Sequence, residues 1–118
     1  MTTIAVTRTY LEMTAPGQLK PARLVDPALA LERVRDCPPP LYRFLYGTVG
    51  ERYHWTDRRG WTDDEIRSHV ARPEITIWVL RHAANPAGYF ELARHADGSI
   101  EIAYFGLIHD YLGRGLGK

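Results

Sequence analysis

The sequence predicts an α+β fold in which helices pack against a mainly antiparallel sheet. From residue 74 onward the apolar residues recur with a period of two, which is typical of strands, whereas residues 27–71 carry helix signals. Short hairpin-type turns join the alternating runs, so neighbouring strands are expected to run antiparallel. The order of strand, helices and three-strand meander excludes a regular alternation of strands and helices around a parallel sheet. At 118 residues, we expect a single domain over residues 1–118.

The first predicted elements are a strand and a helix. Residues 3–14 alternate loosely and are rich in Thr, Val, Ile and Tyr, which predicts a half-buried strand. Asp26 followed by Pro27 has the form of an N-cap with proline at the first helical position. We therefore expect a helix after Asp26 that ends at the three prolines beginning with Pro38.

Two more helices are predicted before the meander. The first begins at Leu41, carries apolar residues at helical spacing as far as Val49, and ends near Tyr53. The second begins after Thr62, which has Glu65 three residues later in the pattern of a capping box. This helix is expected to end near residue 71, before a proline.

The meander consists of three strands over residues 74–82, 88–95 and 99–108. Residues 83–86 contain Asn and Pro, and the second connection contains Asp97 and Gly98, all of them turn-forming residue types. Three consecutive antiparallel strands therefore form the core of the predicted fold.

Charge and apolar content limit the kinds of partner. The net charge is +1, from 15 basic and 14 acidic residues spread along the chain, so no basic stripe predicts a nucleic-acid partner. No apolar run approaches the ~20 residues that a membrane-spanning helix needs, which predicts no membrane partner.

The cysteine and histidine residues indicate neither a disulfide nor a metal site. Cys37 is the single cysteine and has no histidine close to it in sequence, which favours a structural thiol over a nucleophile and fits a cytoplasmic protein. The five histidines show no spacing typical of metal ligands, so no metal is expected.

The last ten residues form a glycine-rich loop with Gly113, Gly115 and Gly117 at alternate positions. Glycine lets consecutive backbone amides turn toward one point, which makes a binding site for phosphate. The spacing differs from both the dinucleotide-binding and the P-loop motifs. A flexible tail is the alternative interpretation of such a segment.

This loop resembles the acetyl-coenzyme A signature of the GNAT (general-control-related) N-acetyltransferases, Gln/Arg-x-x-Gly-x-Gly/Ala. Residues 112–117 match both small-residue positions, with Leu112 where the family has Gln or Arg, and they follow a strand as in the family. The order of elements is similar over nearly the whole chain. The resemblance implies the N-terminal part of a GNAT fold and transfer of an acetyl group from acetyl-CoA to a primary amine, carried by a small molecule or a peptide.

The resemblance also implies where acetyl-CoA binds. In the family the fourth strand bulges and its backbone pairs with the pantetheine arm, which assigns Leu107 and Ile108 to pantetheine and Gly106 to the bulge. Alternatively, Gly106 only ends the strand. The residues assigned to the pyrophosphate are Leu112, Gly113, Arg114, Gly115, Leu116, Gly117 and Lys118.

Two glutamates are candidates for the base that removes a proton from the amine. The family often uses a glutamate on the fourth strand, which implies Glu101, and Glu91 on the neighbouring strand is the second candidate. A solvated cross-strand charge paired with Arg94 is the alternative for Glu101. Strict alternation places Glu101 on one strand face and Ile102 and Tyr104 on the other.

An aromatic-rich segment follows the helix that begins at Leu41, where the family places part of the acceptor wall. Tyr53, His54, Trp55 and Asp57, together with Arg58, are therefore candidates for holding a small polar amine. Core packing of the aromatic rings is the alternative interpretation.

In the family the chain continues after the glycine loop into helices and further strands. We therefore expect residues 1–118 to be an incomplete GNAT domain, inactive by itself because the pyrophosphate site lacks its helix. A second function class is a non-catalytic α+β binding or assembly module that pairs through its exposed last strand. That edge predicts either a homodimer or downstream residues that complete the sheet.

Overall fold

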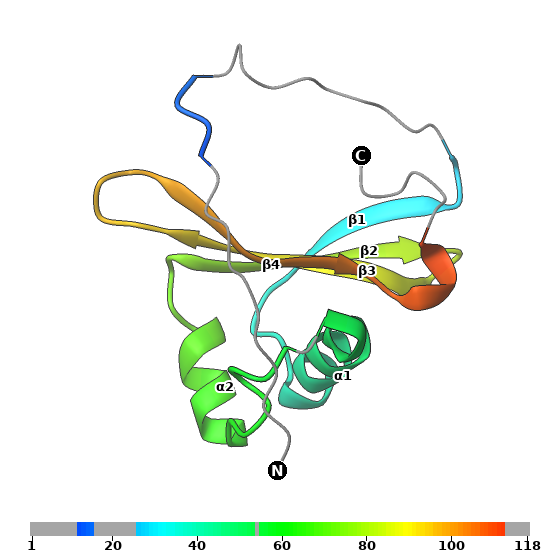
Figure 1. Cartoon of the computed structure of the whole chain (residues 1–118), viewed down its shortest axis with the longest axis horizontal. Helices are drawn as coiled ribbons and strands as arrows, with labels where there is room; N and C mark the ends of the chain where they lie inside the picture. The colour runs from blue at the N-terminus through cyan, green and yellow to red at the C-terminus, as the bar shows by residue number, and fades with distance from the viewer. Residues whose placement is uncertain (1–11, 16–25, 54, 113–118) are drawn as a thin grey trace.

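A computed structural model describes residues 12–15, 26–53 and 55–112. It contains a four-stranded antiparallel sheet in the order β1-β2-β3-β4, with two α-helices on one face, which confirms the predicted α+β class (Figure 1). The elements in chain order are β1 (Leu29–Val34), α1 (Pro39–Gly50), the 3-10 helix η2 (Glu51–Tyr53), α2 (Asp63–Val70), β2 (Ile75–His82), β3 (Asn85–Arg94), β4 (Ile100–Leu107) and the 3-10 helix η3 (His109–Tyr111). Neither α-helix in the described residues is long and apolar enough to cross a bilayer.

The predicted helix after Asp26 is wrong, because this segment forms strand β1. Oδ1 of Asp26 accepts a hydrogen bond from the amide of Ala28 at 2.9 Å, and its carbonyl accepts one from Leu29 at 3.1 Å. These bonds close a turn instead of starting a helix. The next six residues pair with β2 along their whole length. The strand predicted over residues 3–14 lies mostly outside the described residues.

The three prolines start a helix instead of ending one. Pro38 is the N-cap of α1 with an extended backbone, and Pro39 and Pro40 occupy the first two helical positions. An amide hydrogen at these positions would have no partner inside the helix, so proline is tolerated there. The helix predicted from Leu41 is therefore confirmed, and it starts two residues earlier.

Helix α2 begins with the predicted capping box. Oγ1 of Thr62 accepts a hydrogen bond from the amide of Glu65 at 3.2 Å, and the Glu65 side chain accepts one from the amide of Thr62 at 3.0 Å. The buried side chain of Ile66 joins the core between the helices and the sheet.

The predicted meander is confirmed as β2, β3 and β4. Gly98 has a φ of 87° in the turn between β3 and β4, and its amide donates to the carbonyl of His95 at 3.0 Å. The turn between β2 and β3 consists of Ala83 and Ala84, whose φ values are 49° and 72°. Both alanines thus occupy the left-handed region.

A bulge at Ala103 changes which side chains of β4 face the helices. Glu91 pairs with Tyr104, but the next residue, Leu92, pairs with Ile102, so Ala103 is extra on β4. The predicted placement of Ile102 and Tyr104 on one face is therefore wrong. Tyr104 faces the helices beside Glu91, and Ile102 lies on the opposite face.

Gly106 is not the bulge residue, because it pairs in register with Tyr89. It lies instead where β4 approaches α1. A Cβ atom at this position would be 2.3 Å from Cγ1 of Val49, so only glycine fits without a shift of the Val49 side chain or of its helix.

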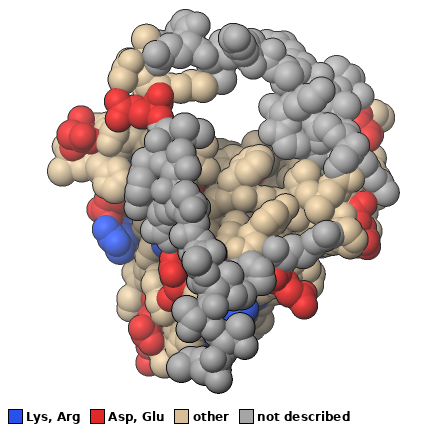
Figure 2. All heavy atoms as spheres, viewed as in Figure 1, with Lys and Arg blue, Asp and Glu red and all other residues tan. Residues whose placement is uncertain are grey.

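The sheet face away from the helices is largely apolar. Leu31, Ile102 and Phe105 are exposed, and Trp78 stacks on Phe90 with ring centroids 6.0 Å apart. Figure 2, which has the same view along the sheet as Figure 1, shows an uncharged patch of described surface between the grey segments, with acidic and basic side chains toward the margins.

Candidate functional site

Helices α1 and α2, strand β3 and the segment with Arg58 bring polar side chains together between the helices and the sheet. We call Glu91, Tyr42, Arg58 and His69 the Glu91 cluster. Glu91 on β3 is fully buried, and Nη1 of Arg58 lies 2.6 and 2.7 Å from its two carboxylate oxygens. Tyr42 donates to Oε1 at 2.8 Å, and Nε2 of His69 lies 2.9 Å from Oε2. Arg58 also donates to the Tyr42 hydroxyl.

The partners of Glu91 keep its carboxylate ionised. Burial alone raises its pKa, but hydrogen bonds from His69 and Arg58 outweigh burial and lower the pKa below the ordinary range of a glutamate. Burial favours the neutral form of Arg58, yet the contacts with Glu91 raise its pKa. The pair is therefore a buried ion pair, and Glu91 is a poor proton acceptor near neutral pH.

Arg58 links this ion pair to β4. Its Cζ lies 4.5 Å from the ring centroid of Tyr104 and 4.8 Å from that of Trp61, within the range of cation–π contacts. Its side chain is only 14% exposed. Trp61 also makes an edge contact with His69, with centroids 5.1 Å apart.

The predicted acceptor residues lie beside Tyr104. The Trp55 ring is 4.8 Å from Tyr104 and 6.1 Å from Tyr53, centroid to centroid, so Trp55 packs within a group of aromatic rings. The Tyr104 hydroxyl donates to Oδ2 of Asp57 at 3.3 Å. Tyr53 is exposed, and His54 lies outside the described residues. The structure thus brings Tyr53, Trp55 and Asp57 together on the helix side of β4.

A small hollow of about 140 Å³ opens onto the Glu91 cluster from the helix side. Its lining residues are Tyr42, Arg43, Tyr46, Gly47, Arg58, Arg59 and Ile66. Deeper in the same layer, the Tyr89 hydroxyl is buried and has no hydrogen-bond partner among the described residues. Burial raises the pKa of Tyr89, so this hydroxyl remains protonated.

Glu101, the first candidate base, lies apart from this cluster. Its side chain is 54% exposed, and Oε1 lies 2.9 Å from Nε2 of His95. Its cross-strand partner is therefore His95 and not Arg94. The charge of Glu101 is accessible to solvent, whereas that of Glu91 is not.

The predicted pantetheine residues lie at the end of β4. Ile108 donates its amide hydrogen to the carbonyl of Ala87 at 2.8 Å, so its backbone faces β3. Backbone direction alternates along an antiparallel strand, so the backbone groups of Phe105 and Leu107 point to the free edge of β4. In the described part of the sheet, β3 is the sole neighbour of β4. Residues 113–118 lie outside the described residues, and Leu112 directly follows η3.

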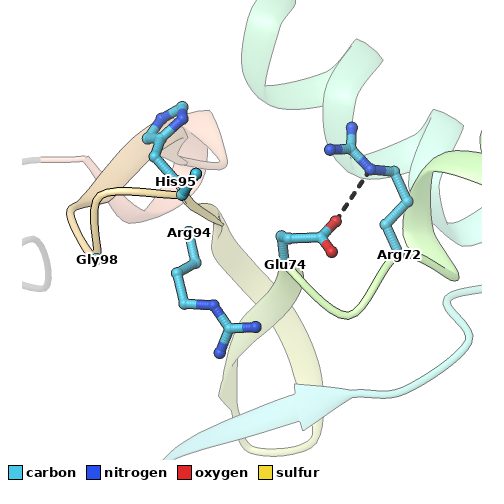
Figure 3. Close-up of a pocket in the computed structure, with 6 residues that line it drawn as sticks. Arg72, Glu74, Arg94, His95 and Gly98 are labelled. Atoms are coloured by element: carbon cyan, nitrogen blue, oxygen red, sulfur yellow. Dashed lines mark hydrogen bonds and ion pairs between the residues drawn. The ribbon is translucent and has the colours of Figure 1, made fainter.

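A larger hollow than the one at the Glu91 cluster lies elsewhere, at the β3–β4 hairpin end of the sheet (Figure 3). It has a volume of about 560 Å³ and a polar lining that includes Arg72, Glu74, Arg94 and His95. Arg72 pairs with Glu74 at 3.2 Å, which satisfies part of its charge. No group of three His, Cys, Asp or Glu within the described residues is arranged to hold a metal ion.

Cys37 is expected to react slowly with thiol reagents in the folded protein. It is 1% exposed, and burial, together with the charge of Glu91, raises its pKa to about 11. The reactive thiolate is thus scarce near pH 8. We expect alkylation by iodoacetamide, followed by mass spectrometry, to be on the order of 100-fold slower than in urea-denatured protein. Equal rates in both states would contradict the buried position.

Sequence reasoning missed Tyr42, His69 and Tyr104 as members of this site. They lie on α1, α2 and β4, and no local pattern joins them. One signal was present in the strand GYFELA, where a period of two puts Glu91 on the same face as Tyr89. A carboxylate on an apolar face needs a cationic partner from another element.

Comparison with known proteins finds no match for this chain. No family model matches the chain, and no curated protein or solved structure matches it. The GNAT resemblance therefore rests on the glycine loop and on the order of the elements.

Proposed function

We propose that the protein is an acetyl-CoA-dependent N-acyltransferase that acetylates a primary amine. The observation that carries this proposal is the environment of β4. Among the described residues no strand pairs with its outer edge, which presents the backbone groups of Phe105 and Leu107, and the glycine-rich residues 113–118 follow η3 in the chain. An extended pantetheine arm could pair with such an edge as an added strand. The glycine loop that follows could then hold the pyrophosphate.

The acceptor would approach from the helix side of β4, where Tyr104, Trp55, Tyr53 and Asp57 lie together. The amine nitrogen attacks the thioester carbonyl carbon, the carbon–sulfur bond breaks, and coenzyme A leaves as the thiol. The proton that the amine loses passes through a base or water to the departing thiolate, which becomes the thiol. Among the two candidates, the accessible Glu101 suits this role better, because Glu91 is buried, ionised and fully hydrogen bonded.

Binding of acetyl-CoA tests this proposal. We expect isothermal titration calorimetry to show saturable binding of acetyl-CoA to the full-length protein. Gly115→Val and Gly117→Val should each weaken binding about tenfold or more, because a side chain blocks the close approach of phosphate. Gly60→Val is the matched control, since a Cβ atom there has no neighbour within 4 Å. Equal affinity in all four proteins would exclude the loop as the site.

A second candidate function is an assembly module that pairs through β4. It is favoured by the exposure of Ile100, Ile102 and Phe105, which are 57%, 64% and 50% exposed. Light scattering over a range of concentrations, together with thermal melting, separates the two functions when each is measured with and without acetyl-CoA. Dimers that depend on protein concentration and not on acetyl-CoA would favour assembly. A monomer that acetyl-CoA stabilises against thermal unfolding would favour the acyltransferase.

A further inference from the structure

We infer that Arg58 is a positioning residue of the acceptor side of this site, fastening residues 55–61 to β3 and β4. This inference rests on the proposed function, and it names a residue that acts without touching the substrate. Arg58 contacts three different elements, α1, β3 and β4.

Both the backbone and the side chain of Arg58 are held. Its amide donates to the hydroxyl of Tyr46 on α1 at 3.1 Å. Its guanidinium binds both carboxylate oxygens of Glu91 on β3 and lies over the ring of Tyr104 on β4. One residue thus joins the segment to the helix layer and to two neighbouring strands.

The segment around Arg58 has little regular structure of its own. Residues 55–61 contain neither helix nor strand, and their backbone bonds are turns such as Arg59 to Thr56 at 3.2 Å and Trp61 to Arg58 at 3.2 Å. A segment with so few internal bonds depends on side-chain contacts for its order. The buried ion pair is the most strongly held of these contacts, because Glu91 is completely buried.

Arg58 links the order of residues 55–61 to the proposed acceptor site around Tyr104 and Asp57. Asp57 precedes it in the chain and accepts a hydrogen bond from the Tyr104 hydroxyl, and Tyr104 follows the β4 bulge at Ala103. When the guanidinium lies against the face of the Tyr104 ring, the hydroxyl and the Asp57 carboxylate stay at one place beside β4. Arg58 therefore acts through Tyr104 and Asp57.

Arginine differs from lysine here in its contacts with the aromatic rings. Nη1 alone makes the polar contacts with the two Glu91 oxygens and the Tyr42 hydroxyl, and an ammonium group, with its three hydrogens, could make them too. The planar guanidinium also lies over the rings of Tyr104 and Trp61, whereas an ammonium is a compact point charge that does not stack in this way. Arg58→Lys thus keeps the charge that neutralises Glu91 and removes the stacking. The matched control is Arg67→Lys, since Arg67 pairs with Asp64 at the surface, with side chains 61% and 97% exposed.

The experiment measures three quantities in wild type, Arg58→Lys and Arg67→Lys. Hydrogen exchange followed by mass spectrometry reports the order of residues 55–61. Calorimetry gives the affinity for acetyl-CoA. Release of the coenzyme A thiol gives KM for the best acceptor among phenethylamine, spermidine and a lysine-containing peptide. In Arg58→Lys we expect exchange in residues 55–61 to be about tenfold faster and the amine KM to rise about tenfold, with acetyl-CoA affinity within about twofold of wild type.

Methylguanidinium provides a test that does not need acetyl-CoA. Arg58→Ala leaves a space bounded by Glu91, Trp61 and Tyr104, and millimolar methylguanidinium should restore slow exchange in residues 55–61, whereas methylammonium should not. If Arg58→Ala does not fold, as judged by circular dichroism, Arg58→Lys alone decides this point.

Each outcome supports or overturns the inference. Unchanged exchange in Arg58→Lys overturns the fastening, and faster exchange with an unchanged amine KM overturns the role in acceptor positioning. A loss of acetyl-CoA affinity in Arg58→Lys as large as the rise in the amine KM would mean a general structural role, and it would overturn the inference as well. A wild-type protein that binds no acetyl-CoA, or acetylates none of the three amines, overturns the proposed function and the acceptor role, while the exchange data still decide whether Arg58 orders the segment.

Discussion

Replacing Glu91 with alanine is expected to lower the free energy of unfolding by about 3–5 kcal/mol, the cost of removing one partner from a buried ion pair. The change leaves the Arg58 guanidinium without a counterion in a largely buried place, and it leaves Tyr42 and His69 without their acceptor. Urea denaturation followed by tryptophan fluorescence measures the loss, because Trp61 lies next to Arg58 and His69.

The matched control is Glu101→Ala, which removes an exposed pair with His95. Exposed pairs contribute about 0–1 kcal/mol, so this variant should unfold within about 1 kcal/mol of wild type. Similar losses in the two variants would contradict the assignment of Glu91 as the buried anchor of the cluster.

The stability of the protein should also depend on pH through Glu91. Its pKa is lowered in the folded protein, so the folded state favours the ionised form more than the unfolded chain does. The resulting stabilisation is complete above the pKa of an unfolded glutamate, about 4.3, and is lost as the pH falls through the lower folded value. Glu91→Gln should therefore lose less stability than wild type between about pH 5 and pH 3 in urea titrations.

Gly106→Ala is expected to cost roughly 1–3 kcal/mol of unfolding free energy, as overpacking of a filled core does. The new Cβ atom would meet Cγ1 of Val49 at 2.3 Å, so either the Val49 side chain must leave its position or β4 and α1 must separate. Adding Val49→Ala removes the colliding methyl groups, and the double variant should be at least about 1 kcal/mol more stable than the sum of the single changes predicts.

Gly47→Ala serves as the control for the Gly106→Ala and Val49→Ala variants. It adds the same methyl group in α1, where a Cβ atom has no neighbour within 4 Å. Alanine has a higher helix propensity than glycine, so this variant should gain up to about 1 kcal/mol. Additive losses for Gly106→Ala and Val49→Ala would mean that the two positions do not collide.

The parts of the fold that sequence predicted correctly are those specified by neighbouring residues. Thr62 and Glu65 form a capping box within four residues, and the Asp97–Gly98 turn needs only its own backbone. The strands of the meander pair with their nearest neighbours in sequence, so alternation and turn chemistry were sufficient to find them.

The failures are places where a distant contact decides the local structure. LALERV suits a helix by propensity, yet pairing with β2 about 45 residues later makes it a strand. The bulge at Ala103 has no glycine to mark it, and it moves Tyr104 to the helix side. The Glu91 cluster draws one residue from each of four segments, so sequence identified Glu91 and Arg58 as polar residues without showing that they form a pair.

The turn between β2 and β3 carries a consequence for the order of folding. Ala83 and Ala84 both have positive φ, where each alanine costs roughly 1–2 kcal/mol that glycine would not. A turn with this backbone cost contributes little to nucleating the hairpin. We therefore expect the register of β2 on β3 to be set by the side chains that the two strands bury, with the turn closing after these side chains have packed.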